Sequence, residues 1–246
     1  MQISYNLKMS KPLIIFVTII VIYIIVQTAY SGYYLLKGWE LADKTNLKDI
    51  KYENNKSKIT VFVNGDSVGA GVGAASIKNT AVGRFASYLE QKHSVELINK
   101  SKSGQKMANM LETVPDKKYD VVVLIVSSND LFHLTPISKF KQNTEKVLGI
   151  YSQKSDKVIL VGPGKVYGSV VIPFPLRFIY KIQAPKYAII IDEEAKKYKN
   201  VIHMNPIDPP PDIGPYKYTD AEDKFHPNDE GHRFWFDLIK KGFERS

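Results

Sequence analysis

Two short segments of the sequence combine side chains that can carry out acyl transfer. Ser67 follows Gly65 and Asp66, and His226 follows Asp223 at a spacing of three residues. A serine hydroxyl is a weak nucleophile until a base accepts its proton, and His226 can be that base if Asp223 holds its other ring nitrogen. The spacing lets a carboxylate and an imidazole hydrogen-bond on one tight turn. We therefore expect a triad of Ser67, His226 and Asp223.

Two further segments carry groups suited to the oxyanion that forms when a serine attacks a carbonyl. Such an oxyanion needs preorganised donors. The candidates are the backbone amides of Ser67 and Gly104 and the side-chain amide of Asn129. Gly104 would let the backbone approach a substrate closely. We expect Asp66 and Asp130 to support these loops by hydrogen-bonding backbone groups, and we propose no metal site and no cofactor-binding residue.

Each of these residues also has an ordinary structural interpretation. A single serine after a strand is usually a turn or helix cap, and a lone Asp-x-x-His is usually a capping pair. The coincidence of four elements favours the catalytic interpretation. The other histidines are not expected to take part: His133 and His232 are predicted to be exposed, with Arg233, and His93 and His203 have no partner at ligand spacing.

The elements that must position these residues alternate along the chain. Short runs rich in Val and Ile alternate with helical patterns, which indicates an α/β domain whose parallel sheet of about five strands is covered on both faces. The predicted strands are 59–64, 95–99, 121–127, 157–161 and 201–204, and the predicted helices are 82–92, 105–113, 137–153, 186–199 and 227–242. Ligands of such sheets bind outside the carboxyl ends of the strands, where three of the four segments follow their strands.

Two connections, 162–185 and 205–225, are long for such a fold and rich in proline and aromatic residues. Loops of this length in a compact domain are usually functional or mobile. The segment 173–178, which reads PFPLRF, is suited to an apolar acyl-binding lip or to insertion into a membrane interface. A packed crossover loop is an equally good interpretation.

Together, the four chemical segments resemble the signature blocks of the SGNH/GDSL hydrolase superfamily. The matching residues are Gly65-Asp66-Ser67, Gly104, Asn129-Asp130 and Asp223-x-x-His226-Pro227, in the family's order and approximate spacing. The resemblance implies a flavodoxin-like three-layer α/β/α domain, a nucleophile, base and acid at Ser67, His226 and Asp223, and oxyanion donors at Gly104 and Asn129. It also implies a serine esterase without cofactor, acting on esters or thioesters that include O-acetyl groups on carbohydrates and acyl chains of lipids.

Two departures from the family pattern occur in these blocks. The third block usually carries glycine where this chain has Ser128, and Val68 replaces the leucine that often follows Gly-Asp-Ser. The second change is conservative. Ser128 adds a side chain beside the oxyanion site, so we expect a narrower pocket or reduced activity. This departure motivates the alternative of a catalytically silent SGNH-like binding or scaffolding module of the cell envelope.

A competing motif lies just after the nucleophile block. Residues 69–74 satisfy the G-x-G-x-x-A dinucleotide fingerprint. In that fingerprint the first glycine lies at the strand-to-helix turn, whereas here Gly65 to Val68 intervene. This placement disfavours nucleotide binding.

The N-terminal region contains an uncharged stretch, 12–36, of 25 residues. As a helix it would measure about 37 Å, enough to cross a hydrocarbon core of about 30 Å. A cleaved signal peptide is the alternative, but 27–30 matches a cleavage site poorly, and Tyr30, Tyr33 and Tyr34 resemble an interfacial aromatic belt. We predict a tail at 1–11, an uncleaved transmembrane signal anchor at 12–36, a polar tether at 37–58 and the hydrolase domain at 59–246.

Composition narrows the chemistry and the partners. The chain has 246 residues, a formal net charge of +9 and no cysteine, which excludes a thiol nucleophile, cysteine-ligated metals and a lipobox. Only four of its basic residues are arginines, which argues against nucleic acid as a partner. The charge is compatible with attraction to anionic lipid or an acidic envelope polymer. The expected partners are an acyl-ester substrate, glycan or lipid, and the membrane; the pattern predicts no oligomeric state.

Orientation across the membrane is not decided by the lysines, because they lie on both sides of the span. Long C-terminal domains translocate largely regardless of their charge. We therefore expect an inside N-terminus and a catalytic domain that is extracytoplasmic, either periplasmic or extracellular.

Overall fold

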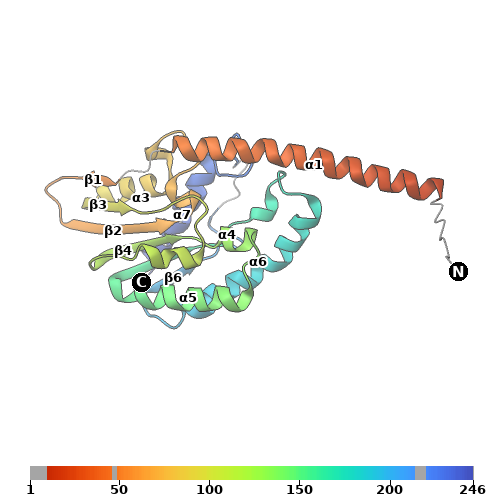
Figure 1. Cartoon of the computed structure of the whole chain (residues 1–246). Coiled ribbons are helices and arrows are strands. Elements are labelled where there is room, and N and C mark those ends of the chain that lie inside the picture. Colours follow the sequence, from red (N-terminus) through yellow and green to blue (C-terminus); the bar gives the residue numbers. More distant parts are fainter. Residues whose placement is uncertain (1–9, 46–48, 214–219, 246) are drawn as a thin grey trace.

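The computed structural model describes residues 10–45, 49–213 and 220–245 (Figure 1). Its centre is a sheet of six strands in the order β1-β3-β2-β4-β5-β6. The strands are β1 (Ile50–Tyr52), β2 (Lys58–Gly65), β3 (Ser94–Asn99), β4 (Tyr119–Ile125), β5 (Ser155–Val161) and β6 (Val201–Met204). Every neighbouring pair is parallel except β1 with β3. The five parallel strands follow the flavodoxin-like order, whose switch point lies between β2 and β4.

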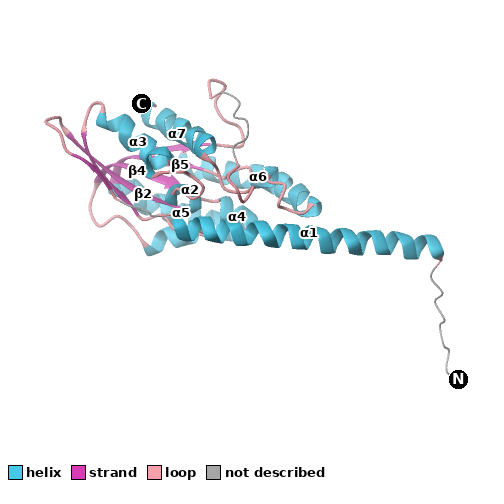
Figure 2. Ribbon diagram, turned by 90° about the horizontal axis from the view of Figure 1, so that it is seen from above, coloured by secondary structure: helices cyan, strands magenta, loops and turns pink. Residues whose placement is uncertain are grey.

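Helices cover both faces of the sheet (Figures 1 and 2), which confirms the predicted three-layer α/β/α fold. On one face, α3 (Ala81–Glu90) and α7 (Asp229–Glu244) pack over a core that contains Val61 and Val63. On the other, α5 (Ile137–Tyr151) and α6 (Phe174–Ala195) pack over a core that contains Phe62. Successive side chains of a strand point to opposite faces, so apolar residues in a row fill both cores. The remaining helical turns are α2 (Ser67–Ala70), α4 (Ser128–Phe132), η1 (Ile77–Asn79), η2 (Met107–Glu112), η3 (Ser152–Lys154) and η4 (Val166–Gly168).

Helix α6 begins much earlier than the sequence pattern predicts. The prediction placed its start at 186, whereas the helix begins at Phe174 and contains Pro185. Pro175 lies in the first turn, where a missing N–H removes no helical hydrogen bond. Tyr180, Ala184 and Tyr187 are buried in the core, so tertiary packing holds the helix together despite the internal proline.

The N-terminal helix α1 (Lys11–Lys44) is long and apolar enough to cross a membrane. It extends eight residues beyond the predicted span; its C-terminal part lies against the α/β domain, and its N-terminal part projects away from it (Figures 1 and 2). Part of the predicted polar tether, 37–58, is therefore helical, and another part is β1, where Ile50 and Tyr52 pack against the core. The sequence pattern did not predict these two elements, because the segment is rich in charged residues.

Candidate active site

The nucleophile segment lies where β2 ends at the switch point of the sheet. Ser67 is the first residue of α2, and Asp66 caps this helix by accepting a hydrogen bond from the Val68 amide at 3.0 Å. The Asp66 amide donates to the Ile125 carbonyl of β4 at 2.8 Å. A Cβ at Gly65 would lie 2.4 Å from that carbonyl oxygen, so only glycine fits there. The turn that presents Ser67 is thus fixed from both sides.

Asp66 is a buried carboxylate beside the nucleophile, and its Oδ2 has no hydrogen-bond partner among the described residues. Burial raises the pKa of Asp66 to about 7, although the Val68 amide acts in the opposite direction. The structure therefore gives Asp66 the supporting role expected from the sequence, and it adds a titration near neutral pH.

The Asp223 and His226 side chains form a close pair on one turn before α7. Asp223 Oδ2 and His226 Nδ1 are 2.5 Å apart, and Asp223 Oδ1 accepts hydrogen bonds from the backbone amides of Phe225 and His226 at 3.1 and 3.0 Å. Burial alone would raise the pKa of Asp223, but the hydrogen bond and charge of His226 and the two amides outweigh it and lower the pKa. A carboxylate held in this way fixes the imidazole by Nδ1 and leaves Nε2 available to the cavity.

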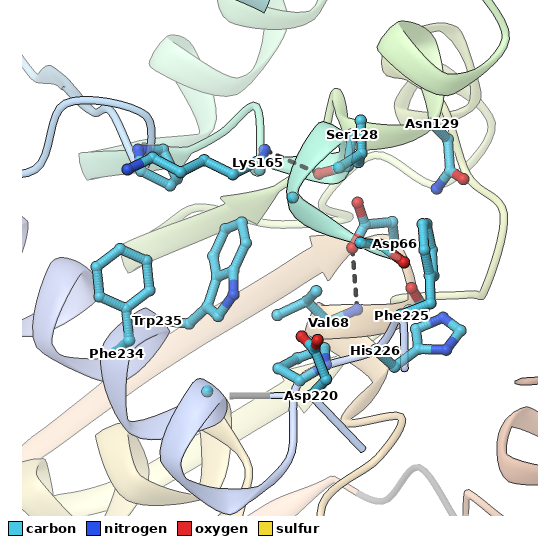
Figure 3. A pocket seen from close by; sticks show the side chains of 18 of the residues that line it. Asp66, Val68, Ser128, Asn129, Lys165, Asp220, Phe225, His226, Phe234 and Trp235 are labelled. Carbon is cyan, nitrogen blue, oxygen red and sulfur yellow. Dashed lines mark hydrogen bonds between the residues drawn. The ribbon is translucent and has the colours of Figure 1, made fainter. Parts of the chain in front are cut away.

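Ser67 and His226 line one cavity of about 660 Å³. Its wall carries aromatic side chains from Phe225, Phe234 and Trp235 (Figure 3). The Ser67 hydroxyl forms no hydrogen bond with any residue that the structure describes. The structure thus contains the Asp223–His226 contact and a serine that lines the same cavity as His226. Catalytic hydrogen bonds often tighten only when substrate binds.

The expected oxyanion donors are brought together only in part. Ser67 and Asn129 line the cavity, whereas Gly104 is not among its lining residues. The Asn129 side-chain amide donates to the carbonyl of Gln105, next to Gly104, at 3.1 Å. Gly104 has a φ of 79°, a conformation that favours glycine.

Asp130 connects two of the loops that carry these donors. Its Oδ2 accepts a hydrogen bond from the Met107 amide at 2.6 Å, which joins α4 to the loop that follows Gly104. Burial raises the pKa of Asp130. This contact matches the supporting role expected for Asp130.

In the third signature block, the structure changes which serine stands at the position that favours glycine. The residue with a left-handed backbone is Ser127, with a φ of 85°, so Ser127 and not Ser128 occupies the position that favours glycine on conformational grounds. Ser128 does line the cavity, as expected. Its hydroxyl accepts a hydrogen bond from the Gly164 amide at 3.0 Å and so holds the opposite wall.

The prediction that His232 is exposed was wrong. Its side chain is fully buried: Nδ1 accepts a hydrogen bond from the Ala81 amide at 3.3 Å, and Nε2 donates to the Val72 carbonyl at 3.0 Å. Burial lowers the pKa of His232 to about 4. Arg233 is exposed, as expected, whereas His232 points inward and pairs with backbone groups of the loop at Val72 and of the first residue of α3, Ala81.

Sequence reasoning missed a contribution from the N-terminal helix. Gly38 is the one buried residue of α1, and a Cβ there would lie 2.9 Å from Asp223 Oδ2 and 3.6 Å from His226 Cε1. The backbone of α1 therefore packs directly against the Asp–His pair. A glycine in an otherwise bulky helical stretch was the available signal.

Comparison with solved structures identifies relatives of this fold. Axe2, an acetylxylan esterase from Geobacillus stearothermophilus, is 16% identical with a TM-score of 0.56, over 79% of this chain and 98% of that chain. LAE5, an α/β hydrolase enzyme from the metagenome of Lake Arreo, Spain, is 15% identical with a TM-score of 0.55, over 76% and 95%. TesA is 18% identical with a TM-score of 0.58, over 75% and 98%. These similarities show a shared fold.

Sequence comparison is more specific about the family. No curated protein matches the chain. The sequence model of the GDSL-like lipase/acylhydrolase family matches residues 63–234, which is more than half of the chain. The matched region includes the segment around Ser67 and the turn that carries Asp223 and His226. The chain therefore belongs to the GDSL-like lipase/acylhydrolase family.

Proposed function

We propose that the chain is a serine ester hydrolase that acts on an acyl or acetyl ester. Ser67 Oγ attacks the ester carbonyl and gives its proton to His226 Nε2, while Asp223 stabilises the imidazolium. The tetrahedral oxyanion is stabilised by the Ser67 amide and the Asn129 side chain. His226 then protonates the leaving alcohol, and water hydrolyses the acyl-enzyme by the same groups in reverse order.

The observation that carries this proposal is the Asp223–His226 pair, whose histidine lines the same cavity as Ser67. Family membership supports ester hydrolysis as the reaction class. Two of the solved Axe2 structures are described as catalytic mutants in which a serine or an aspartate is replaced by alanine, so that protein uses the same residue types. The cavity walls carry both aromatic and polar groups, which suits a small acyl group on a glycan as well as an acyl chain.

The test is hydrolysis of p-nitrophenyl acetate by the full chain in detergent, together with labelling by a fluorophosphonate. Ser67→Ala should abolish both, and Ser101→Ala, at a buried serine outside the cavity, should keep both. A wild-type chain that neither hydrolyses the ester nor reacts with the probe would instead favour the silent scaffolding module. A series of p-nitrophenyl esters then separates the substrates, because an acetyl preference indicates a glycan O-acetyl esterase and a long-chain preference a lipase or thioesterase.

We further propose that α1 is an uncleaved anchor that places the domain outside the cytoplasm. The packing of Gly38 against the Asp–His pair supports retention of the helix, because cleavage within it would leave this contact on a short helical stub. Alkaline phosphatase fused to the C-terminus should be active if the domain is exported, and inactive if it faces the cytoplasm.

A further inference from the structure

Helix α1 is docked on the domain at a defined point along its length. Residues 11–26 are exposed all round, and contact with the domain begins at Gln27. The Ser31 hydroxyl donates to the Val171 carbonyl at 2.6 Å, and the Gln27 side-chain amide donates to the same oxygen at 3.4 Å. At the residue before Ser31, the Tyr30 hydroxyl accepts a hydrogen bond from Lys224 Nζ at 3.2 Å. The anchor and the domain are therefore joined by direct packing.

The length of the exposed part is too short to cross a membrane. From Lys11 to Val26 the helix measures about 24 Å, whereas a hydrocarbon core of about 30 Å requires about 20 residues. Counted from Pro12, about 20 residues reach Ser31. The hydrocarbon must therefore extend to the level of Ser31, and any tilt of the helix moves this boundary further toward the domain. Because Val171 contacts Ser31, the loop before α6 lies at the membrane boundary.

The part of the domain at this level is apolar and exposed. We call it the α6 lip, and it consists of Val170, Phe174, Leu176, Phe178, Ile179 and Ile182. Phe174 is 66% exposed and Phe178 60%. In both views the N-terminal end of α6 extends beside α1, in the direction in which α1 leaves the domain (Figures 1 and 2). A contiguous apolar surface of this kind marks an interaction site, and here the adjoining helix indicates its partner.

We propose that the α6 lip inserts into the interface of the bilayer that α1 spans, so that the active-site cavity receives esters presented at the membrane surface. The inference rests on the proposed anchor and esterase activity and specifies where the substrate is held. The loop that reaches the lip also lines the cavity, through Gly164, Lys165 and Ser169. An ester in the outer leaflet would thus approach Ser67 past the same loop that contacts α1.

Depth-dependent quenching tests the insertion, because the chain has no cysteine and single labels can be placed freely. Phe178→Cys, Ile189→Cys and Val17→Cys variants of the full chain are labelled with a fluorophore and reconstituted in phosphatidylcholine vesicles that contain nitroxide-labelled lipid. Ile189 is the matched control, since it is 56% exposed on the same helix but lies about three turns from Phe178. Quenching at 178 and 17 but not at 189 is the expected result.

Three other outcomes overturn the proposal in different ways. Quenching at 17 alone would show that the span is real and that the lip lies in water. Absence of quenching at both 17 and 178 would remove the anchor on which the inference depends. Equal quenching at 178 and 189 would show nonspecific adsorption of the whole helix to the vesicles.

Activity separates the membrane step from the chemical step. In the Phe174→Glu/Phe178→Glu double variant, hydrolysis of a fluorogenic acyl ester embedded in the vesicles should fall by roughly tenfold, since burial of one or two phenylalanines is worth at least this much. Hydrolysis of soluble p-nitrophenyl acetate should not change, because neither residue lines the cavity. An unchanged rate of hydrolysis of the vesicle-embedded ester would contradict insertion of the α6 lip. A wild-type chain inactive on the soluble ester would contradict the proposed function instead.

Discussion

At the scale of single residues, the Asp223–His226 pair packs against a glycine, Gly38, that is distant in the sequence. Gly38→Ala would place a Cβ 2.9 Å from Asp223 Oδ2, so the carboxylate or the helix must shift. We expect kcat to fall by up to about 10²-fold with little change in KM, because a displacement of about 1 Å in a catalytic group has effects of this size. The measurement is steady-state hydrolysis of a soluble ester by the full chain.

Gly32 provides the matched control for this substitution. It lies in the same helix, and a Cβ there would meet no atom within 4 Å. Alanine favours a helix over glycine by about 1 kcal/mol, so neither variant should lose helical stability. Equal activity of the two variants would show that the contact of α1 with Asp223 has no catalytic effect.

Ser128 acts on the cavity wall rather than on the reacting atoms. Ser128→Ala removes the acceptor of the Gly164 amide hydrogen bond. If no water replaces the hydroxyl, the unpaired amide costs about 1–3 kcal/mol of stability. We expect a several-fold increase in KM at nearly constant kcat, since the loop that begins at Gly164 lines the cavity. A large fall in kcat with unchanged KM would mean that the hydroxyl contacts the reacting ester.

Asp66 makes the stability of the protein depend on pH. Its pKa of about 7 in the folded chain is above the ordinary value of 3.8, so between these values the native state binds more protons than the unfolded state. From this group alone, the free energy of unfolding falls as pH rises from about 4 to about 7, with a slope that approaches 1.4 kcal/mol per pH unit. Asp66→Asn, which keeps the capping oxygen, should remove this slope in urea unfolding curves. An identical slope in wild type and variant would place the titration elsewhere.

At the scale of elements, α7 is attached to the start of α3 by His232. The pKa of His232 is lowered from 6.5 to about 4, so between these values the unfolded state binds the extra proton. This contribution to stability is complete above about pH 6.5 and is lost as pH falls toward 4. His232→Gln should remove this contribution, so that the melting temperature of the variant, measured by circular dichroism, rises relative to that of the wild type as pH falls from 6.5 to 4. Melting temperatures that change with pH by the same amount in wild type and variant would contradict the role of His232.

The order of the five parallel strands could be predicted because most of them contain successive Val, Ile or Leu residues, as at 121–123 and 158–161. The turns that carry Ser67 and His226 could also be predicted, because their residue types and spacing are those that the proposed chemistry requires. Helix α6 could not be delimited, because the burial of Tyr180 and Tyr187 outweighs Pro185. The inward orientation of His232 and the contact of Gly38 depend on packing between distant elements, which local patterns do not encode.

At the scale of the whole molecule, the pH responses of Asp66 and His232 oppose each other over nearly the same interval. The wild-type protein should therefore show a flatter dependence of stability on pH between about 4 and 7 than either single variant. Asp66→Asn should rise in stability with pH and His232→Gln should fall. Parallel profiles for the two variants would contradict this compensation.

If α1 is the anchor proposed above, its continuity also determines how the protein would meet an ester in the bilayer. A flexible tether over 37–58 would have an end-to-end distance of about 26 Å and would let the site sample a volume above the membrane. In the proposed arrangement the docked helix would hold the site at one height, so the encounter would be a search in two dimensions, by lateral diffusion within the leaflet. Turnover should then follow the mole fraction of ester in the bilayer and be independent of the total vesicle concentration.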